Sequence, residues 1–183
     1  MKKPPLYTLT LILLITTILP ITTLTSCARP PKNAYEILSA MTQTQPNLPA
    51  GQTYRGGAAA AANGHADDGH TNDGHADDEL LAVLYGEGSL PCEFEVINDY
   101  AIRLSGFAAP YELAVFCCVS SKDAYDVAQM CLRRAEALRI SGRETPWESI
   151  TEGARVCLWG RYVLMAVGDD PLAAIEAGRR AAG

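Results

Sequence analysis

The histidines of this chain are confined to one short repeated segment. His65, His70 and His75 recur at intervals of five in NGHADDGHTNDGHADDE, among aspartates that include Asp68 and Asp73. Imidazole and carboxylate groups are competent ligands for zinc and similar divalent ions. With a spacing of five, neither a helix nor a strand would place the three imidazole rings on one face. Only a coil could bring them together, and closing a coil around a metal costs entropy. We interpret the segment as a low-complexity spacer, with weak Zn²⁺-type binding by these five side chains as the alternative.

The same confinement bears on catalysis. With every histidine in that segment, Ser-His-Asp and Cys-His schemes have no base elsewhere in the chain. The paired carboxylates Glu93 with Glu95 and Asp169 with Asp170 are typical of an exposed strand face and a helix cap. No glycine-rich phosphate loop is present. The sequence therefore predicts a protein that is not an enzyme.

The cysteines indicate packing more than chemistry. No Cys-x-x-Cys motif occurs, which disfavours a zinc ribbon or a thioredoxin-like site. Cys117 and Cys118 are neighbours in an apolar run, where a strand directs them to opposite faces. We expect buried small hydrophobic residues, with one disulfide, such as Cys92 to a strand cysteine, as the alternative. Five cysteines follow Cys27: Cys92, Cys117, Cys118, Cys131 and Cys157.

The N-terminus has the layout of a bacterial export signal. Lys2 and Lys3 precede an apolar run from Leu6 to Leu19, and the segment Leu24-Thr25-Ser26-Cys27 resembles a lipobox. The sequence predicts cleavage before Cys27 and acylation of its thiol, giving a palmitate-type lipoprotein on the outer face of the bacterial cell membrane. An uncleaved transmembrane anchor is the alternative, but seven threonines and a proline between Leu6 and Ser26 disfavour it.

Charge limits the class of partner. Removing residues 1–26 removes two lysines and no acidic residue, so the formal charge falls from −6 to −8. An acidic chain with scattered arginines lacks the basic footprint that nucleic acid requires. Arg179 and Arg180 fall in the last turn of a predicted helix, where the helix dipole explains them. The membrane, reached through the lipid, is the one partner that the sequence predicts; a protein or small-molecule partner stays open.

The hydrophobic patterns predict a small α+β domain after a linker. We divide the chain into a signal peptide (1–26), a lipidated segment with a short helix (27–45), a Gly/Ala/His/Asp linker (46–78) and an α/β domain (79–183). The order β-β-α-β-β-α predicts an antiparallel sheet with both helices on one face, a two-layer sandwich. The expected elements are a helix opened by Asn33, a helix from Asp78 to Gly86, strands Asp99–Ser105 and Glu112–Val119, a helix Ser121–Gly142, strands Ala154–Trp159 and Tyr162–Val167, and a helix after Asp170.

Local patterns add four details. Val127, Cys131, Leu132 and Leu138 follow helical spacing and are predicted to be buried, so that Leu132→Ala costs about 2 to 5 kcal/mol. Gly160-Arg161 suits a type II′ hairpin turn. Asp170 before Pro171 is a helix cap with proline at the first helical position. The segment with Pro146 and Trp147 is expected to be a loop.

Taken in order, four segments resemble the domain-of-unknown-function 4358 family of clostridial-type lipoproteins. They are Leu80-Leu-Ala-Val-Leu-Tyr-Gly86, Asp99-Tyr-Ala-Ile-Arg103, Glu112-Leu-Ala-Val-Phe116 and Gly160-Arg-Tyr-Val-Leu164. The likeness covers residues 33–182 except the histidine segment, and the chain departs from it at Glu144-Thr-Pro-Trp-Glu148. The resemblance implies an exported, lipid-anchored α/β domain. We expect a non-enzymatic binding or envelope-associated module, with a metal-binding lipoprotein as the alternative.

Overall fold

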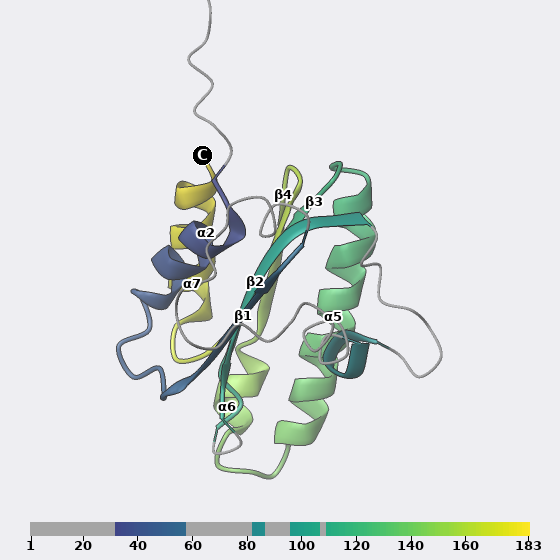
Figure 1. Ribbon diagram of the computed structural model, residues 1–183. Helices are drawn as coiled ribbons and strands as arrows, with labels where there is room; N and C mark the ends of the chain where they lie inside the picture. The colour runs from purple at the N-terminus through teal and green to yellow at the C-terminus, as the bar shows by residue number, and fades with distance from the viewer. Residues whose placement is uncertain (1–31, 58–81, 87–95, 107–108) are drawn as a thin grey trace, which may run out of the picture. The chain divides into compact units, whose positions relative to one another are not determined.

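The computed structural model describes residues 32–57, 82–86, 96–106 and 109–183. These residues belong to one compact unit. A further helical turn lies at residues 82–85. The helices and strands are α2 (Ala34–Thr42), β1 (Gly51–Gly56), β2 (Ile97–Ser105), β3 (Glu112–Cys118), α5 (Asp123–Gly142), α6 (Glu148–Glu152), β4 (Arg155–Trp159), β5 (Tyr162–Val167) and α7 (Pro171–Ala182) (Figure 1).

The strands form one antiparallel sheet in the order β1-β2-β3-β5-β4. β3 lies at the centre, and all seven of its residues are buried, as its apolar sequence predicts. The α+β class is confirmed, and the predicted order β-β-α-β-β-α is found from β2 to α7, with β1 before it and α6 added between α5 and β4. The four predicted strands lie within two residues of their expected bounds.

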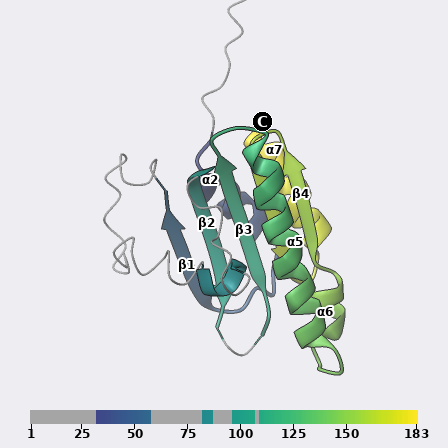
Figure 2. The same ribbon diagram turned by 90° about the vertical axis from the view of Figure 1, so that its right-hand side faces the viewer.

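Helices cover both faces of the sheet, so the prediction that both helices share one face is wrong. Along β3, Ala114, Phe116 and Cys118 pack in a cluster with α5, whereas the alternate residues pack in a second cluster with α2 and α7. Figures 1 and 2 show the sheet between α5 on one side and α2 with α7 on the other. The physical reason was visible in the sequence, because a strand that is apolar on both faces needs a cover on both.

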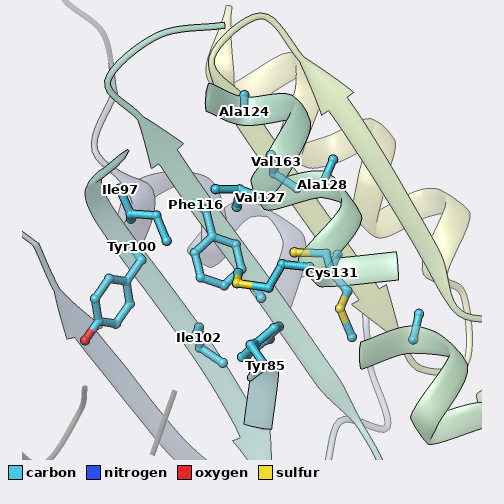
Figure 3. Packing of buried hydrophobic residues seen from close by; sticks show 14 of the residues in the cluster. Tyr85, Ile97, Tyr100, Ile102, Phe116, Ala124, Val127, Ala128, Cys131 and Val163 are labelled. Carbon is cyan, nitrogen blue, oxygen red and sulfur yellow. The ribbon is translucent and has the colours of Figure 1, made fainter. Parts of the chain in front are cut away.

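The α5 face is built around Phe116 (Figure 3). The ring of Tyr85 meets Phe116 edge-on with centroids 5.3 Å apart. Val127, Cys131 and Leu138 are buried as predicted.

The prediction for Leu132 is wrong, since 48% of this residue is exposed while Met130 is fully buried. Each residue turns a helix by about 100°, and the buried arc of α5 is rotated toward Met130 and Arg134. The rotation brings Arg134 to a buried partner on β3. We therefore expect the loss of about 2 to 5 kcal/mol in the free energy of unfolding for Met130→Ala rather than for Leu132→Ala.

α2 is an integral part of the domain. Asn33 Oδ1 accepts a hydrogen bond of 2.8 Å from the backbone N–H of Glu36, which confirms the predicted cap. Ile37, Leu38 and Met41 are buried against the sheet and α7. Gly178 allows the close approach of α7, because a Cβ there would lie 3.0 Å from Leu164 and Met41. The prediction that residues 27–45 lie outside the folded domain is therefore wrong for α2.

The predicted linker contains a strand. Residues Gly51–Gly56 form β1, which pairs with β2 from Gly51 opposite Ser105 to Gly56 opposite Tyr100. The sequence GQTYRG has no apolar alternation to reveal it, because an edge strand is held by backbone hydrogen bonds. The histidine segment lies outside the described residues. Gly57 before it and Ala82 after it belong to the same compact unit, so the segment connects two points of one domain.

Turns and caps follow the sequence closely. Gly160 has φ 58° and Arg161 has no positive φ, which fits the predicted type II′ turn. Asp170 caps α7 by accepting a 2.9 Å hydrogen bond from Ala173 N–H. α5 begins at Asp123, two residues after its predicted start, and Ser120 Oγ accepts from the N–H of Asp123 at 3.2 Å. The expected loop around Trp147 runs into the short helix α6.

Candidate functional site

The site residues predicted from the sequence lie outside the described part of the chain. This holds for Cys27, His65, Asp68, His70, Asp73 and His75. Among the described residues, no group of three or more His, Cys, Asp or Glu side chains is placed to hold a metal ion. Across residues 32–57, 82–86, 96–106 and 109–183, no helix has the length and apolarity to cross a membrane.

A buried carboxylate at the start of β3 accepts hydrogen bonds from two side chains. Glu112 is 2% exposed. Arg134 on α5 donates to its Oε2 through Nη2 at 2.7 Å and through Nε at 3.1 Å. The hydroxyl of Tyr85 donates to Oε1 at 2.5 Å. We name these three residues the Glu112 cluster.

The electrostatics of the Glu112 cluster favour a structural role. Burial, followed by the charge of Glu112, raises the pKa of Tyr85 well above its ordinary value, so the phenol keeps its proton and stays a donor. Both carboxylate oxygens of Glu112 accept hydrogen bonds from these partners, which satisfies a charge that would otherwise be costly to bury. The sequence signal was a single glutamate in an apolar central strand, facing an arginine on the covering helix.

A second buried carboxylate fastens the start of the domain. Asp99 on β2 accepts a hydrogen bond of 2.6 Å from the N–H of Ala34, the first residue of α2. Burial raises the pKa of Asp99. The hydroxyl of Tyr162 donates to the carbonyl of Lys32 at 3.2 Å. These contacts hold the chain against one end of the sheet, which we call the Lys32 end.

The thiols are packed rather than activated. Cys117 and Cys118 are buried on opposite faces of the sheet as predicted, and Cys131 is buried on α5. Burial raises the pKa of all three, to about 12 for Cys118, so they are protonated at neutral pH and poor nucleophiles. These thiols and the half-buried Cys157 are unpaired. Cys92 lies outside the described residues, so the alternative of a disulfide between Cys92 and a strand cysteine stays a prediction.

The opposite end of the sheet, the Asp170 end, is held by neutral and charged hydrogen bonds. Tyr111 donates to Asp169 Oδ1 at 2.7 Å, and this bond is the main cause that raises the pKa of Tyr111 to about 12. Gln45 donates from Nε2 to the carbonyl of Asp170 at 2.6 Å and accepts from its N–H at 3.3 Å. Asp169 and Asp170 therefore serve as a hydrogen-bond acceptor and a helix cap.

An open basic surface lies at the Lys32 end, where the β4–β5 hairpin meets the last turn of α7. A shallow pocket of about 370 Å³ is lined there by Trp159, Glu176, Arg179, Arg180 and Gly183. The guanidinium of Arg179 lies 4.3 Å from the centre of the Trp159 ring. We name two neighbouring groups of residues the basic corner: Trp159, Arg179 and Arg180, which line the pocket, and Lys32 and Arg161, which lie beside Tyr162.

The arginine side chains of the basic corner are of a type that binds anions, and they stay protonated at neutral pH. Arginine groups form bidentate hydrogen bonds with carboxylate and phosphate, and Trp159 adds apolar surface. In the sequence, the helix dipole explains Arg179 and Arg180, and no local signal points to this surface. The hairpin and the end of α7 are about twenty residues apart in the chain, so no local pattern joins them.

No family model matches the chain, and neither a curated protein nor a solved structure matches it. The resemblance to the domain-of-unknown-function 4358 family stays a prediction.

Proposed function

We propose that this protein is a lipoprotein, anchored through Cys27 to the outer face of the bacterial cell membrane, whose α+β domain is a non-enzymatic binding or envelope-associated module. The observation that carries the proposal is the lipobox-like segment Leu24-Thr25-Ser26-Cys27 at the end of an export-type sequence. A thiol that carries two acyl chains gives stable membrane attachment where one chain gives marginal attachment.

The contacts inside the domain support the binding role. Glu112 and Asp99 are bound by internal donors, and the buried thiols keep their protons. The two carboxylates and the thiols therefore stabilise the fold. Arg179 and Arg180, by contrast, are exposed, and both line the shallow pocket. An exposed anion-binding surface suits recognition rather than catalysis.

Metabolic labelling tests the anchor. The full-length chain is expressed in a bacterium fed with a clickable palmitate analogue, beside Cys27→Ser and the matched control Cys157→Ser. We expect label on the wild type and on Cys157→Ser, and none on Cys27→Ser, which should also keep the larger size of the precursor. A wild-type protein without label, or label that persists in Cys27→Ser, would contradict the proposal.

Metal binding is the second candidate function. Both ends of the histidine segment are attached to the same domain, since Gly57 and Ala82 lie in one compact unit. A closed loop costs less additional entropy on binding a metal than an open chain does. His65, His70 and His75 with Asp68 and Asp73 would supply imidazole and carboxylate ligands.

Zinc titration of the full mature chain tests this candidate. The chain carries Cys27→Ser to keep it free of lipid, and the histidine ring signals are followed by NMR. Saturable one-to-one binding that is lost on acidification through a pKa near 6.5, and lost in the triple variant His65→Gln, His70→Gln, His75→Gln, would support it. Weak, unsaturated broadening would leave the segment as a spacer.

A further inference from the structure

The chain reaches the domain at the same end as the basic corner. Lys32, the first described residue, is held there by the hydrogen bond from Tyr162. It lies five positions after Cys27. A fully extended chain spans about 3.3 to 3.6 Å per residue, so a lipid on Cys27 keeps Lys32 within about 18 Å of the attachment point. The Lys32 end is therefore the end of the domain that a membrane anchor holds nearest to the bilayer.

We propose that the basic corner rests on the membrane surface, with its guanidinium groups on anionic phospholipid headgroups and Trp159 at headgroup level. This inference rests on the proposed lipid anchor at Cys27 and adds the orientation of the domain to it. The partner is the lipid surface itself, identified by its phosphate-rich negative charge.

Charge complementarity supports this orientation. Arg179 and Arg180 line the pocket together with one acidic side chain, Glu176, and Arg161 and Lys32 lie beside Tyr162 at the same end of the sheet. Basic side chains near a surface are attracted to anionic headgroups within about a Debye length. Asp123 and Asp126 lie in the first turn of α5, which covers the opposite face of the sheet. The corner, rather than the whole end, is therefore the part that should meet the lipid.

The aromatic part of the corner fits the same surface. Leu158 and Trp159 are exposed at the tip of the hairpin, although both are large and apolar. Tryptophan is enriched at the boundary between headgroups and acyl chains, where an amphipathic ring is favoured. The stacking of Arg179 on Trp159 places a cation beside that ring. Arginine and tryptophan together match a layer that is charged outside and apolar beneath.

Attachment through the lipid is needed for this contact to form. The mature chain has a formal charge of −8, so an anionic membrane repels the protein as a whole at long range. A short tether raises the local concentration of the corner at the surface, and the local charges then decide the orientation. The experiment must therefore use the lipidated protein.

The chain carries a matched pair of reporters. It has two tryptophans. Trp159 ends β4, and Trp147 immediately precedes α6. Figure 1 shows α6 at the end of the domain opposite the β4–β5 hairpin. The exposed fractions of the two tryptophans are nearly equal, at 39% and 37%. The 20-residue helix α5 separates the two ends by about 30 Å. Trp147→Phe leaves Trp159 alone, and Trp159→Phe leaves Trp147 alone.

The lipidated variants are reconstituted in vesicles of equal parts phosphatidylcholine and phosphatidylglycerol with brominated acyl chains. Flotation with the vesicles is scored first, and quenching of tryptophan emission second. We expect quenching of Trp159 to be about twofold stronger or more than that of Trp147, since one lies at the interface and the other about 30 Å away. Omitting phosphatidylglycerol should reduce the difference.

Charge reversal supplies the matched control. In the Trp147→Phe background, the pair Arg179→Glu and Arg180→Glu should lower the quenching of Trp159. Arg139→Glu and Arg143→Glu, which make the same change of net charge near the end of α5, should leave it unchanged. Near-ultraviolet circular dichroism checks that each variant is folded. Equal quenching of both tryptophans in protein that floats would overturn the orientation alone, whereas loss of flotation would overturn the anchor and this inference together.

Discussion

The Glu112 cluster and the basic corner differ in whether their charged groups are buried and paired or exposed. In the Glu112 cluster, a carboxylate that is almost fully buried is bound by a guanidinium and a phenol. In the basic corner, Arg179 and Arg180 lie on exposed residues in the last turn of α7. A buried charge must be paired because its desolvation is costly, whereas exposed charges add little to stability. The first region therefore holds the fold together, and the second is available to a partner.

The largest effect should come from removing the arginine of the Glu112 cluster. Arg134→Ala leaves Glu112 as a buried carboxylate without its countercharge, and we expect it to lower the free energy of unfolding by about 3 to 5 kcal/mol. Urea denaturation followed by circular dichroism measures this loss.

The same helix offers the control. Arg139 pairs with Glu136 on the exposed side of α5. Arg139→Ala should cost no more than about 0.5 kcal/mol, because exposed ion pairs on a helix contribute little. Equal costs for the two variants would remove the distinction between buried and exposed charge on which the comparison depends.

An intermediate effect is expected from the Asp170 end. Tyr111→Phe removes the hydrogen bond to Asp169 and should cost about 1 to 2 kcal/mol at neutral pH. The folded state raises the pKa of Tyr111 from 10.0 to about 12, so the contribution is fully present below pH 10 and is lost as the pH rises through 12. The stability difference between wild type and variant should therefore shrink between pH 10 and 12. A difference that grows over this range would show that the phenol is not held as a donor.

The smallest effect on stability should come from the basic corner. Arg179→Glu with Arg180→Glu is expected to change the free energy of unfolding by about 1 kcal/mol or less, mainly through the helix dipole at the end of α7. The thermal melt of the full mature chain checks this value. A loss as large as that of Arg134→Ala would mean that the corner is part of the structural framework.

The sequence predicted those features that depend on neighbouring residues. The caps at Asn33 and Asp170 and the turn at Gly160 are local, and the structure confirms them. It also predicted the central position of β3, whose apolar residues leave little choice. Burial of Leu132 was wrong because helical spacing fixes the pattern but not the rotation of the helix toward its partner.

Features that depend on distant segments were missed. β1 pairs with a strand that begins more than forty residues later, and its own sequence is polar. The basic corner joins Lys32, the β4–β5 hairpin and the end of α7, which meet only in the folded domain. The second helical layer could have been inferred, since the apolar faces of β3 required two covers.

The mass of the N-terminal peptide of the mature protein, isolated from bacterial membranes, tests the central claim most directly. The proposed lipid anchor at Cys27 underlies both the proposed function and the proposed orientation of the domain. We predict a peptide that begins at Cys27 and carries the mass of a diacylglyceryl group on its thiol. A peptide that begins at another residue, or one with an unmodified Cys27, would contradict the account.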